Sequence, residues 1–286
     1  MIEEKNKVNK STLYLVATPI GNLADISERA KKVLSEVDFI AAEDTRNSMR
    51  LLSAYGIRSE LVSYYEHNKK VSGERIIERL LSGESCALIT DAGMPAVSDP
   101  GEDIVRLCAD AGITVSVIPG ASAVVSALAL SALSTRRFTF EGFLSAKPSE
   151  RKKQLEDIKG EKRTMIFYEA PHKLKRTLLD MKDVFGEDRK ISLCRELTKL
   201  NEEAIRTTLC GAIKLYEESE PRGEYVLVLE GAEEAGVIEE AVDSSLSPRE
   251  QVEELIASGT QKKDAIKEVA KRLGVPKSEI YNLMID

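Results

Sequence analysis

Residues 88–101 read LITDAGMPAVSDPG and join an apolar stretch to a helix-like one. The preceding residues 85–89, SCALI, have the composition of a buried strand, and Glu102 and Asp103 suit the N-terminus of a helix. Such a connection usually needs about two to six residues, yet seven Asp, Gly, Pro and Ser residues crowd into positions 91–101. The stretch is therefore either a long surface loop or a loop whose backbone touches a ligand.

The stretches around this loop alternate between strand and helix patterns. Predicted strands lie at 11–20, 39–44, 60–65, 85–93 and 113–120. Predicted helices follow them at 25–37, 49–57, 73–83, 102–112 and 121–133. Strands that alternate with helices in this way predict an α/β fold with a parallel sheet.

A second series of strand and helix patterns follows. Predicted strands lie at 137–144, 164–170, 190–197 and 224–231, with helices at 149–158 and 173–186. Residues 202–219 are mixed, with a Thr-rich start that suits a strand and an end that suits a helix. We therefore expect two α/β domains, at 11–119 and 120–231, then an acidic, Ser-rich linker at 232–247 and a small helix-turn-helix-like unit at 248–286. That last unit could bind ribosomal RNA, or it could serve as a dimerisation or packing module.

Composition narrows the class of protein. The chain has 286 residues, 42% of them hydrophobic and 31% charged, and a net charge of -7 that argues against a generally basic nucleic-acid binder. No apolar run of about 18 residues occurs and the N-terminus has no signal-peptide pattern, so we expect a cytoplasmic protein with no membrane contact. The four cysteines are scattered and there are two histidines, which predicts reduced thiols and no metal site.

Familiar nucleotide-binding motifs are absent, but three turns are marked by glycine and proline. There is no G-x-G-x-x-G fingerprint and no P-loop. Instead TPIGN at 18–22, DAGMP at 91–95 and IPGAS at 118–122 each follow a predicted strand. Ligands of open α/β sheets bind beyond the carboxyl ends of the strands. Any one of these turns could be ordinary turn chemistry, but three together favour a ligand cleft.

Eight blocks, in order, resemble a known family. They are VATPIGNLADIS, AEDTR, LITDAGMPAVSDPG, VIPGASA, FEGFL, FYEAPHKL, CRELTK and RGEYVLVLEG. Between about Ser11 and Gly231 the chain is similar to the branch of the tetrapyrrole-methylase superfamily that methylates ribose 2′-oxygens of small-subunit ribosomal RNA. The resemblance implies two α/β domains with S-adenosyl-L-methionine in the cleft between them, a homodimer, and a cytidine of the ribosomal RNA or of the 30S subunit as substrate.

The same resemblance implies the residues that bind the cofactor. They come from the first turn, from the loop at 91–98, from the start of the helix at 121–133 and from two later positions. These residues are Pro19, Gly21, Asp91, Ala92, Gly93, Met94, Val97, Ser98, Ser122, Ala123, Tyr168 and Leu200. The long loop is then explained as backbone that wraps the methionyl and ribose parts of the methyl donor.

Methyl transfer to a hydroxyl also needs a base, because the hydroxyl must lose its proton. We assign the catalytic candidates Glu43, Asp44, His67 and Lys199, with Glu43 and Asp44 first because they end a predicted strand. Alternatives remain: Asp44 could cap the next helix, His67 could be a structural loop histidine, and Lys199 could face solvent or RNA.

RNA needs local positive charge on this acidic chain, because phosphate contacts dominate affinity. Residues 145–153 carry a net charge of +3 and residues 162–176 a net charge of +4, with Phe143, Phe167 and Tyr168 available for base stacking. The predicted RNA-binding residues are Arg46, Lys147, Arg151, Lys152, Lys153, His172 and Lys173.

Two other readings of the sequence remain open. The chain could methylate another substrate, such as a tetrapyrrole. It could also be a non-catalytic RNA- or ribosome-binding protein that keeps the fold.

Overall fold

The structure is a computed structural model that describes residues 7–217, 219–232, 246–273 and 275–285. The chain divides into two compact units, residues 1–232 and 233–286. We call them the α/β unit and the tail unit. Most of the predicted linker at 232–247 lies outside the described residues.

The first sheet of the α/β unit contains five parallel strands in the order β3-β2-β4-β1-β5. The strands are β1 (Thr12–Val16), β2 (Phe39–Ala42), β3 (Glu60–Ser63), β4 (Cys86–Ile89) and β5 (Thr114–Ile118). The short helix η1 (Leu23–Asp25) and the helices α2 (Glu28–Glu36), α3 (Thr45–Ala54), α4 (Lys69–Leu81) and α5 (Gly101–Asp110) connect them. The predicted parallel sheet is confirmed, with α3 and α4 each beginning four residues earlier than expected.

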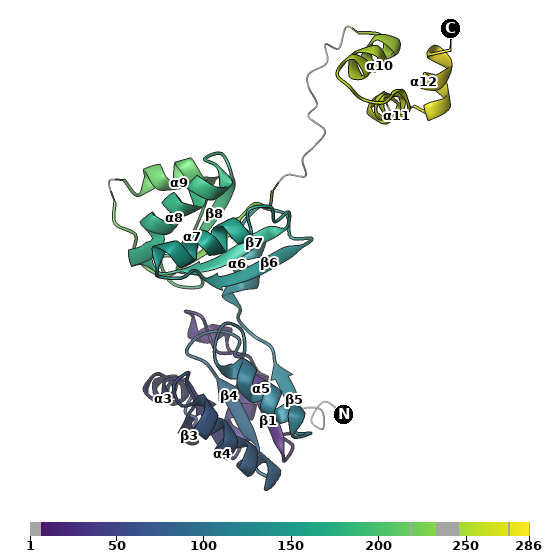
Figure 1. Cartoon of the computed structure of the whole chain (residues 1–286). Coiled ribbons are helices and arrows are strands. Elements are labelled where there is room, and N and C mark those ends of the chain that lie inside the picture. Colours follow the sequence, from purple (N-terminus) through teal and green to yellow (C-terminus); the bar gives the residue numbers. More distant parts are fainter. Residues whose placement is uncertain (1–6, 218, 233–245, 274, 286) are drawn as a thin grey trace. The chain divides into compact units, whose positions relative to one another are not determined.

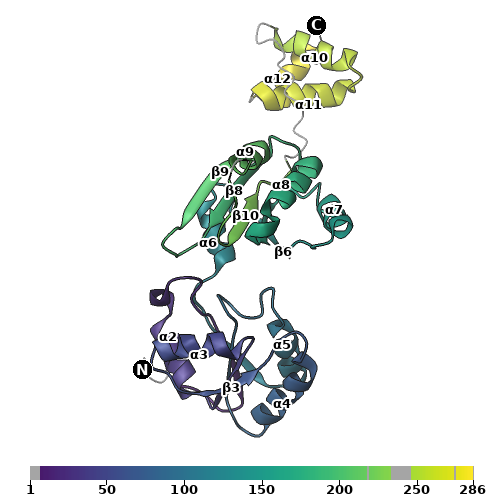
Figure 2. The same ribbon diagram turned by 90° about the vertical axis from the view of Figure 1, so that its left-hand side faces the viewer.

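Both faces of the sheet are buried at its three central strands β2, β4 and β1, which explains why these strands are nearly continuous apolar runs. Tyr14 and Val16 of β1 belong to a core that includes buried residues of α2 and α3, whereas Leu13 belongs to a core that includes buried residues of α4 and α5. Figure 2 shows α2 and α3 on one side of the sheet and α4 and α5 on the other.

The second sheet is mixed and follows the order β6-β7-β10-β8-β9. Its strands are β6 (Phe138–Phe143), β7 (Thr164–Glu169), β8 (Lys190–Arg195), β9 (Glu203–Thr208) and β10 (Tyr225–Leu229). Strand β10 is antiparallel to both of its neighbours, and only β6 and β7 are a parallel pair in this sheet. The predicted mixed segment at 202–219 is confirmed as β9 followed by a helix.

Helices cover the second sheet on both faces (Figure 1). They are α6 (Ala123–Leu130), α7 (Pro148–Asp157), α8 (Pro171–Phe185) and α9 (Leu209–Leu215). Buried residues of α7, α8 and α9 share one core, and Val124, Ala127 and Leu128 of α6 pack on the opposite face. The chain therefore passes from the first sheet to the second between Ile118 and Ala123. We call the parts before and after this passage the N-terminal and C-terminal halves.

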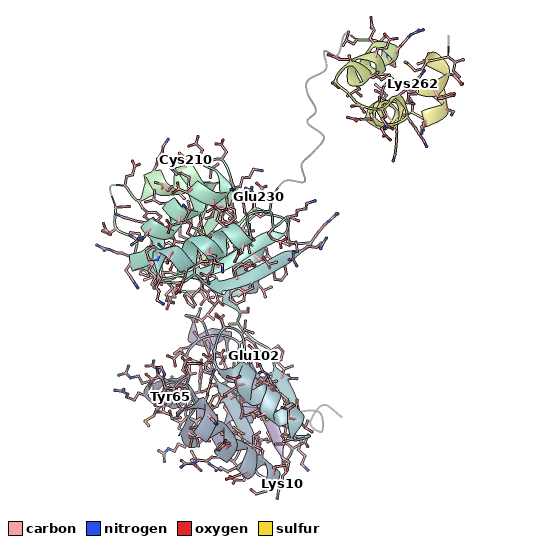
Figure 3. All side chains as sticks on the ribbon, in the orientation of Figure 1. Lys10, Tyr65, Glu102, Cys210, Glu230 and Lys262 are labelled. Atoms are coloured by element: carbon pink, nitrogen blue, oxygen red, sulfur yellow. The ribbon has the colours of Figure 1, made fainter. Side chains whose placement is uncertain are left out.

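The strand order brings the carboxyl ends of β1 and β4 together. The two strands are paired, and beyond their ends Thr18 and Gly93 form an isolated antiparallel bridge. In Figure 3, Lys10, just before β1, and Glu102, just after the β4 loop, lie at opposite ends of the N-terminal half, with Glu102 at the end next to the C-terminal half. The predicted glycine- and proline-marked turns thus meet at one edge of the sheet.

The tail unit consists of the helices α10 (Pro248–Ala257), α11 (Lys262–Leu273) and α12 (Lys277–Leu283). Ser247 and Glu250 form a capping box at the start of α10. The core of the unit is small and consists of Val252, Ala265, Ile266, Val269, Ala270 and Ile280. Among the described residues of the whole chain, no helix is long and apolar enough to cross a membrane.

Candidate functional site

A cavity of about 630 Å³ is lined by residues of both halves. Its walls come from the ends of β1, β2, β4 and β5 in the N-terminal half and from β6, β7, β8 and β10 in the C-terminal half. The lining residues are Ile20, Glu43, Thr90, Ala92, Gly93, Met94, Val97, Ser98, Asp99, Ser122, Ala123, Phe143, Tyr168, Glu169, Ala170, Pro171, His172, Cys194, Leu197, Glu224, Tyr225 and Val226. This volume is within the range that holds a small-molecule ligand or cofactor.

The loop after β4 is held in an unusual conformation by Asp99. Ala96 and Ser98 both have positive φ angles, 65° and 69°, which side-chain-bearing residues rarely adopt. The Asp99 carboxylate accepts hydrogen bonds from the backbone N–H groups of Ala96, Val97 and Gly101, at 3.0, 3.3 and 2.7 Å. These charge-assisted bonds offset the backbone strain. They fix the part of the loop that faces the cavity.

Gly93 joins this loop to the first turn. Its φ angle is +85°, and a Cβ atom at this position would lie 3.2 Å from Cγ2 of Ile20. Its carbonyl and N–H are bonded to Thr18, and the Thr18 hydroxyl also donates to the carbonyl of Thr90. Gly93 therefore allows both the left-handed turn and the close approach of two loops beneath the cavity.

Aromatic rings form part of the opposite wall. The ring of Tyr168 lies edge-on to Phe140, with centroids 4.9 Å apart, and is tilted against Phe143 at 5.3 Å. Burial raises the pKa of the Tyr168 hydroxyl. Gly142 adopts a φ angle of +65° next to a bulge in β6, and its Cβ position would lie 3.5 Å from Oγ of Ser98. The backbone of β6 beside the aromatic wall therefore lies close to Ser98 of the β4 loop.

Four carboxylates line the cavity, and three of them are already engaged. Asp99 holds the β4 loop. Glu169 is buried, and its carboxylate accepts from the Thr177 hydroxyl and from the N–H of Ala170. Glu224 accepts from Lys199.

Glu43 is the fourth carboxylate and has no cationic partner among the described residues. Its side chain accepts only a 3.3 Å hydrogen bond from the Thr90 hydroxyl. Partial burial, together with the negative charge of Asp91, raises the pKa of Glu43. This carboxylate is therefore the one in the cavity that is best suited to accept a proton.

Eight of the twelve predicted cofactor residues line the cavity. They are Ala92, Gly93, Met94, Val97, Ser98, Ser122, Ala123 and Tyr168. Their assignment to the cofactor stays a prediction.

The other four lie beside the cavity or away from it. Pro19 is buried between the lining residue Ile20 and the bridge residue Thr18. Asp91 accepts a hydrogen bond from Nδ2 of Asn47. Gly21 is needed for packing, because a Cβ atom there would overlap the Lys199 side chain and lie 2.9 Å from the carbonyl oxygen of Leu197. Leu200 does not form a wall of the cavity: it is 99% exposed, and Leu197 lines the cavity instead.

The structure separates the four predicted catalytic residues, and only Glu43 lines the cavity. Asp44 caps α3, where its carboxylate accepts from the N–H groups of Arg46 and Asn47. His67 is exposed and lies edge-on to Tyr65. Lys199 binds Glu196 and Glu224 at 2.9 and 2.8 Å.

The environment of Lys199 does not suit a base. Burial opposes its charge, but the hydrogen bonds to Glu224 and Glu196 outweigh this effect and raise the pKa of the amine. A lysine with a raised pKa stays protonated, so it has no free electron pair to accept a proton. Its position supports a structural role between two carboxylates.

The predicted RNA-binding residues also fall into separate groups. His172 lines the cavity and Lys173 follows it in the first turn of α8. Lys152 and Lys153 are exposed on α7, where Lys147 forms an ion pair with Glu150. Phe167, expected to stack on bases, is fully buried in the core. Arg46 is exposed in the first turn of α3.

Arg151 is not available to RNA, which corrects the prediction. Its side chain is 3% exposed, pairs with Asp180 at 2.6 Å and donates to the carbonyl of Ser145 at 3.1 Å. An arginine buried among such partners stabilises the contact between α7 and α8.

Sequence reasoning missed most of the wall that the C-terminal half provides. Cys194, Tyr225 and Val226 line the cavity because β10 lies between β7 and β8, with Tyr225 opposite both Glu169 and Arg195. No local signal reveals this pairing. Ile20 and Thr90 could have been found, because Ile20 lies within the marked turn at 18–22 and Thr90 directly precedes the marked turn at 91–95. Within the described parts of the chain, no group of three or more His, Cys, Asp or Glu side chains is arranged to hold a metal ion.

Comparison with known proteins gives consistent results. A family model described as tetrapyrrole (corrin/porphyrin) methylases matches residues 12–212. A protein of Halalkalibacterium halodurans named ribosomal RNA small subunit methyltransferase I is 50% identical over 275 residues, which cover 96% of this chain and 95% of that protein. A Bacillus subtilis protein of the same name is 47% identical over 277 residues, covering 96% and 94%.

Solved structures with a similar fold are more distant in sequence. Uroporphyrin-III-C-methyltransferase from Thermus thermophilus matches with a TM-score of 0.53 and 19% identity, over 77% of this chain and 94% of that one. Diphthine synthase matches with a TM-score of 0.57 and 17% identity, over 77% and 90%. At these identities the likeness concerns the fold alone.

Proposed function

The chain belongs to the tetrapyrrole (corrin/porphyrin) methylase family, in the group of the ribosomal RNA small subunit methyltransferase I proteins. On that basis we propose that it methylates small-subunit ribosomal RNA with S-adenosyl-L-methionine. The proposed product is a cytidine methylated on its ribose 2′-oxygen. The observation that carries the proposal is a cavity built from both halves of the α/β unit, in which Glu43 is a carboxylate without a cationic partner.

The residues of the cavity fit this cofactor. Gly93 leaves the backbone of the β4 loop accessible, and the small side chains of Ser122 and Ala123 leave space at the start of α6. Tyr168 offers an aromatic surface for an adenine ring. Glu43 and Asp99 make the cavity electronegative, which suits a cationic sulfonium. When bound, S-adenosylmethionine supplies a methyl group already activated for transfer.

The chain must hold the ribose hydroxyl in position and remove its proton. Positioning of two reactants can lower a barrier by about 7–11 kcal/mol in favourable cases. The fixed β4 loop provides a rigid surface for this purpose, because Asp99 restrains its backbone. Glu43 accepts the proton of the hydroxyl, and its raised pKa strengthens it as a base.

The test compares small ribosomal subunits from cells with and without this protein. Purified protein and S-adenosylmethionine are added to subunits and to deproteinised RNA from the deficient cells, and nuclease fragments are weighed by mass spectrometry. We expect one cytidine to gain the mass of a CH₂ group on its ribose. No gain in mass with either substrate would contradict the proposed function.

We also propose that the protein works as a homodimer in the cytoplasm, where ribosomal subunits are found. Support comes from exposed apolar side chains on the edge strand β5 and on α6. Val117 and Val125 are 51% and 56% exposed there, and a second hollow is lined by Ile20, Val125 and Ala129. Exposed apolar side chains, together with a sheet edge that has no further neighbouring strand, fit contact with a second copy of the same surface.

The oligomeric state tests this second proposal. Light scattering after gel filtration should give twice the mass of the chain for the wild-type protein and the monomer mass for Val125→Glu. Leu179→Glu, on the exposed face of α8, serves as the control and should remain dimeric. A monomeric wild-type protein at micromolar concentration would contradict the homodimer.

A further inference from the structure

Helix α3 carries two exposed arginines, and one of them is in an electrostatically unfavourable position. Arg46 is in the first turn of the helix, where the macrodipole disfavours a positive charge, and Arg50 follows one turn later on the same face. Both residues are exposed, and their guanidinium groups form no ion pair or hydrogen bond with any described residue. The carboxylate of Asp44 does not compensate them directly, because it binds the backbone N–H groups of the helix.

The position of α3 relates these arginines to the cavity. Glu43, which lines the cavity, precedes Arg46 by three residues. The hydrogen bond from Asn47 to Asp91 ties the first turn of α3 to the β4 loop at 3.1 Å. Arg46 and Arg50 therefore form a positively charged rim on the N-terminal half. We call it the α3 rim.

The C-terminal half carries a similar arrangement. Helix α8 also begins at the cavity, where Pro171 and His172 line the wall. Its first turn contains no acidic residue, and its N-cap, Ala170, makes no side-chain hydrogen bond. Lys173 in that turn and Arg176 three residues later have no ion-pair partner among the described residues. These two cations form the α8 rim.

Several other cations of the predicted basic segments are already paired, whereas Lys152 and Lys153 on α7 are exposed and lie outside the cavity lining. Lys147 pairs with Glu150, Lys175 with Glu220 and Arg163 with Glu161. In contrast, both rims place unpaired cations in or near a first helical turn. Helix α8 begins in the cavity wall, and α3 begins two residues after the lining residue Glu43. An external polyanion would remove the electrostatic cost at both sites. Cations placed against the preference of a helix N-terminus, without a compensating partner, are expected mainly at functional sites.

We propose that the α3 rim and the α8 rim bind the phosphates of a single-stranded RNA segment on the two sides of the target ribose. This inference rests on the proposed function and specifies how that site holds its substrate. A single strand fits because one nucleotide must leave its neighbours for its ribose to reach Glu43, which a base-paired helix resists. The phosphates flanking that nucleotide then meet the guanidinium and ammonium groups, which bind them without regard to sequence.

The test measures binding of a labelled single-stranded oligoribonucleotide over a range of salt concentrations. The variants are Arg46→Glu/Arg50→Glu for the α3 rim and Lys173→Glu/Arg176→Glu for the α8 rim, each with the matching alanine pair. The controls are Arg58→Glu, just before the amino end of β3, and Lys214→Glu on α9, both exposed cations that lie outside the cavity lining. Calorimetry with S-adenosylmethionine reports whether each variant keeps its cofactor site.

We expect each alanine pair to weaken RNA binding at least tenfold at low salt and to reduce the slope of log K against log salt by about 1.4, since each single-strand phosphate contact contributes about 0.7. The glutamate pairs should weaken binding further, and the controls and all cofactor affinities should stay at wild-type values. Wild-type slopes in both rim variants, or loss of cofactor affinity with loss of RNA binding, would overturn the inference. Absence of RNA methylation by the wild-type protein would instead contradict the proposed function.

Discussion

Thr18 and Gly93 exchange two main-chain hydrogen bonds, with N···O distances of 2.9 and 3.1 Å, and so join the loops that follow β1 and β4. The two residues are 75 positions apart in the sequence. Their bridge forms the base from which the β4 loop rises into the cavity. Changes at either residue should therefore affect the cavity as well as stability.

Replacement of Gly93 by Ala should lower both stability and cofactor affinity. The left-handed conformation costs an L-residue about 1–2 kcal/mol, and the new methyl group would press on Ile20 at 3.2 Å. We expect a fall in Tm of a few degrees and a Kd for S-adenosylmethionine at least tenfold higher, measured by thermal unfolding and calorimetry.

Gly112→Ala is the matched control for this prediction. Gly112 has a φ angle of +67°, and its Cβ position would meet nothing within 4 Å. This variant should lose similar stability and keep its cofactor affinity. Equal cofactor affinity in both variants would show that Gly93 does not shape the site.

Asp99→Ala should loosen the β4 loop. The change removes the acceptor of three backbone N–H groups and leaves the positive φ angles of Ala96 and Ser98 without compensation. Loss of hydrogen bonds to a charged group costs about 1.5–3 kcal/mol, so we expect a lower free energy of unfolding in urea and a weaker cofactor complex. Asp110→Ala, at the exposed end of α5, should be neutral or slightly stabilising.

Glu43→Gln should abolish methyl transfer and leave cofactor binding intact. The glutamine cannot accept the proton, whereas it keeps the size of the side chain. Glu102→Gln, on the exposed first turn of α5, is the control. Methyl transfer at the wild-type rate by the Glu43 variant would rule out this residue as the base.

The pH dependence follows from the direction of the Glu43 shift. Burial and the charge of Asp91 raise the pKa of Glu43 in the folded protein, so the ionised carboxylate lowers the free energy of unfolding. This destabilisation is relieved as pH falls through the folded pKa and Glu43 becomes protonated. The rate should fall in the same range, which lies above the ordinary glutamate value of about 4.3. Rate–pH profiles at saturating substrate should show one acid limb there, and a flat profile down to pH 4.3 would contradict it.

Arg151→Ala should destabilise the α/β unit, in contrast to the exposed lysines beside it. Removal of Arg151 leaves Asp180 and the carbonyl of Ser145 without their donor. We expect a loss of about 1–3 kcal/mol in urea unfolding. Lys152→Ala should change stability by less than about 0.5 kcal/mol. If both variants unfold at the same urea concentration, the buried ion pair is not important for stability.

The sequence by itself determined the architecture of the N-terminal half and the place of its ligand site. Short apolar strands alternate with amphipathic helices, and this local periodicity is sufficient to predict a parallel sheet. Glycine and proline mark the turns after β1, β4 and β5, and Glu43 ends the predicted strand at 39–44, so the β4 loop and Glu43 could be assigned to one edge. The same local logic identified the short strand and helix in residues 202–219.

Only the tertiary structure decided which side chains are free to act. Asp44 caps a helix, Lys199 lies between two carboxylates and Arg151 is buried against Asp180, although all three look like exposed charges in the sequence. Strand β10 reaches the cavity because it pairs between β7 and β8, which come earlier in the chain. The periodicity of apolar residues predicts the local conformation of a segment. Which residues distant in sequence it contacts depends on packing and charge pairing across the whole unit. The assignment of a residue to structure or to chemistry therefore depends on contacts that no local pattern contains.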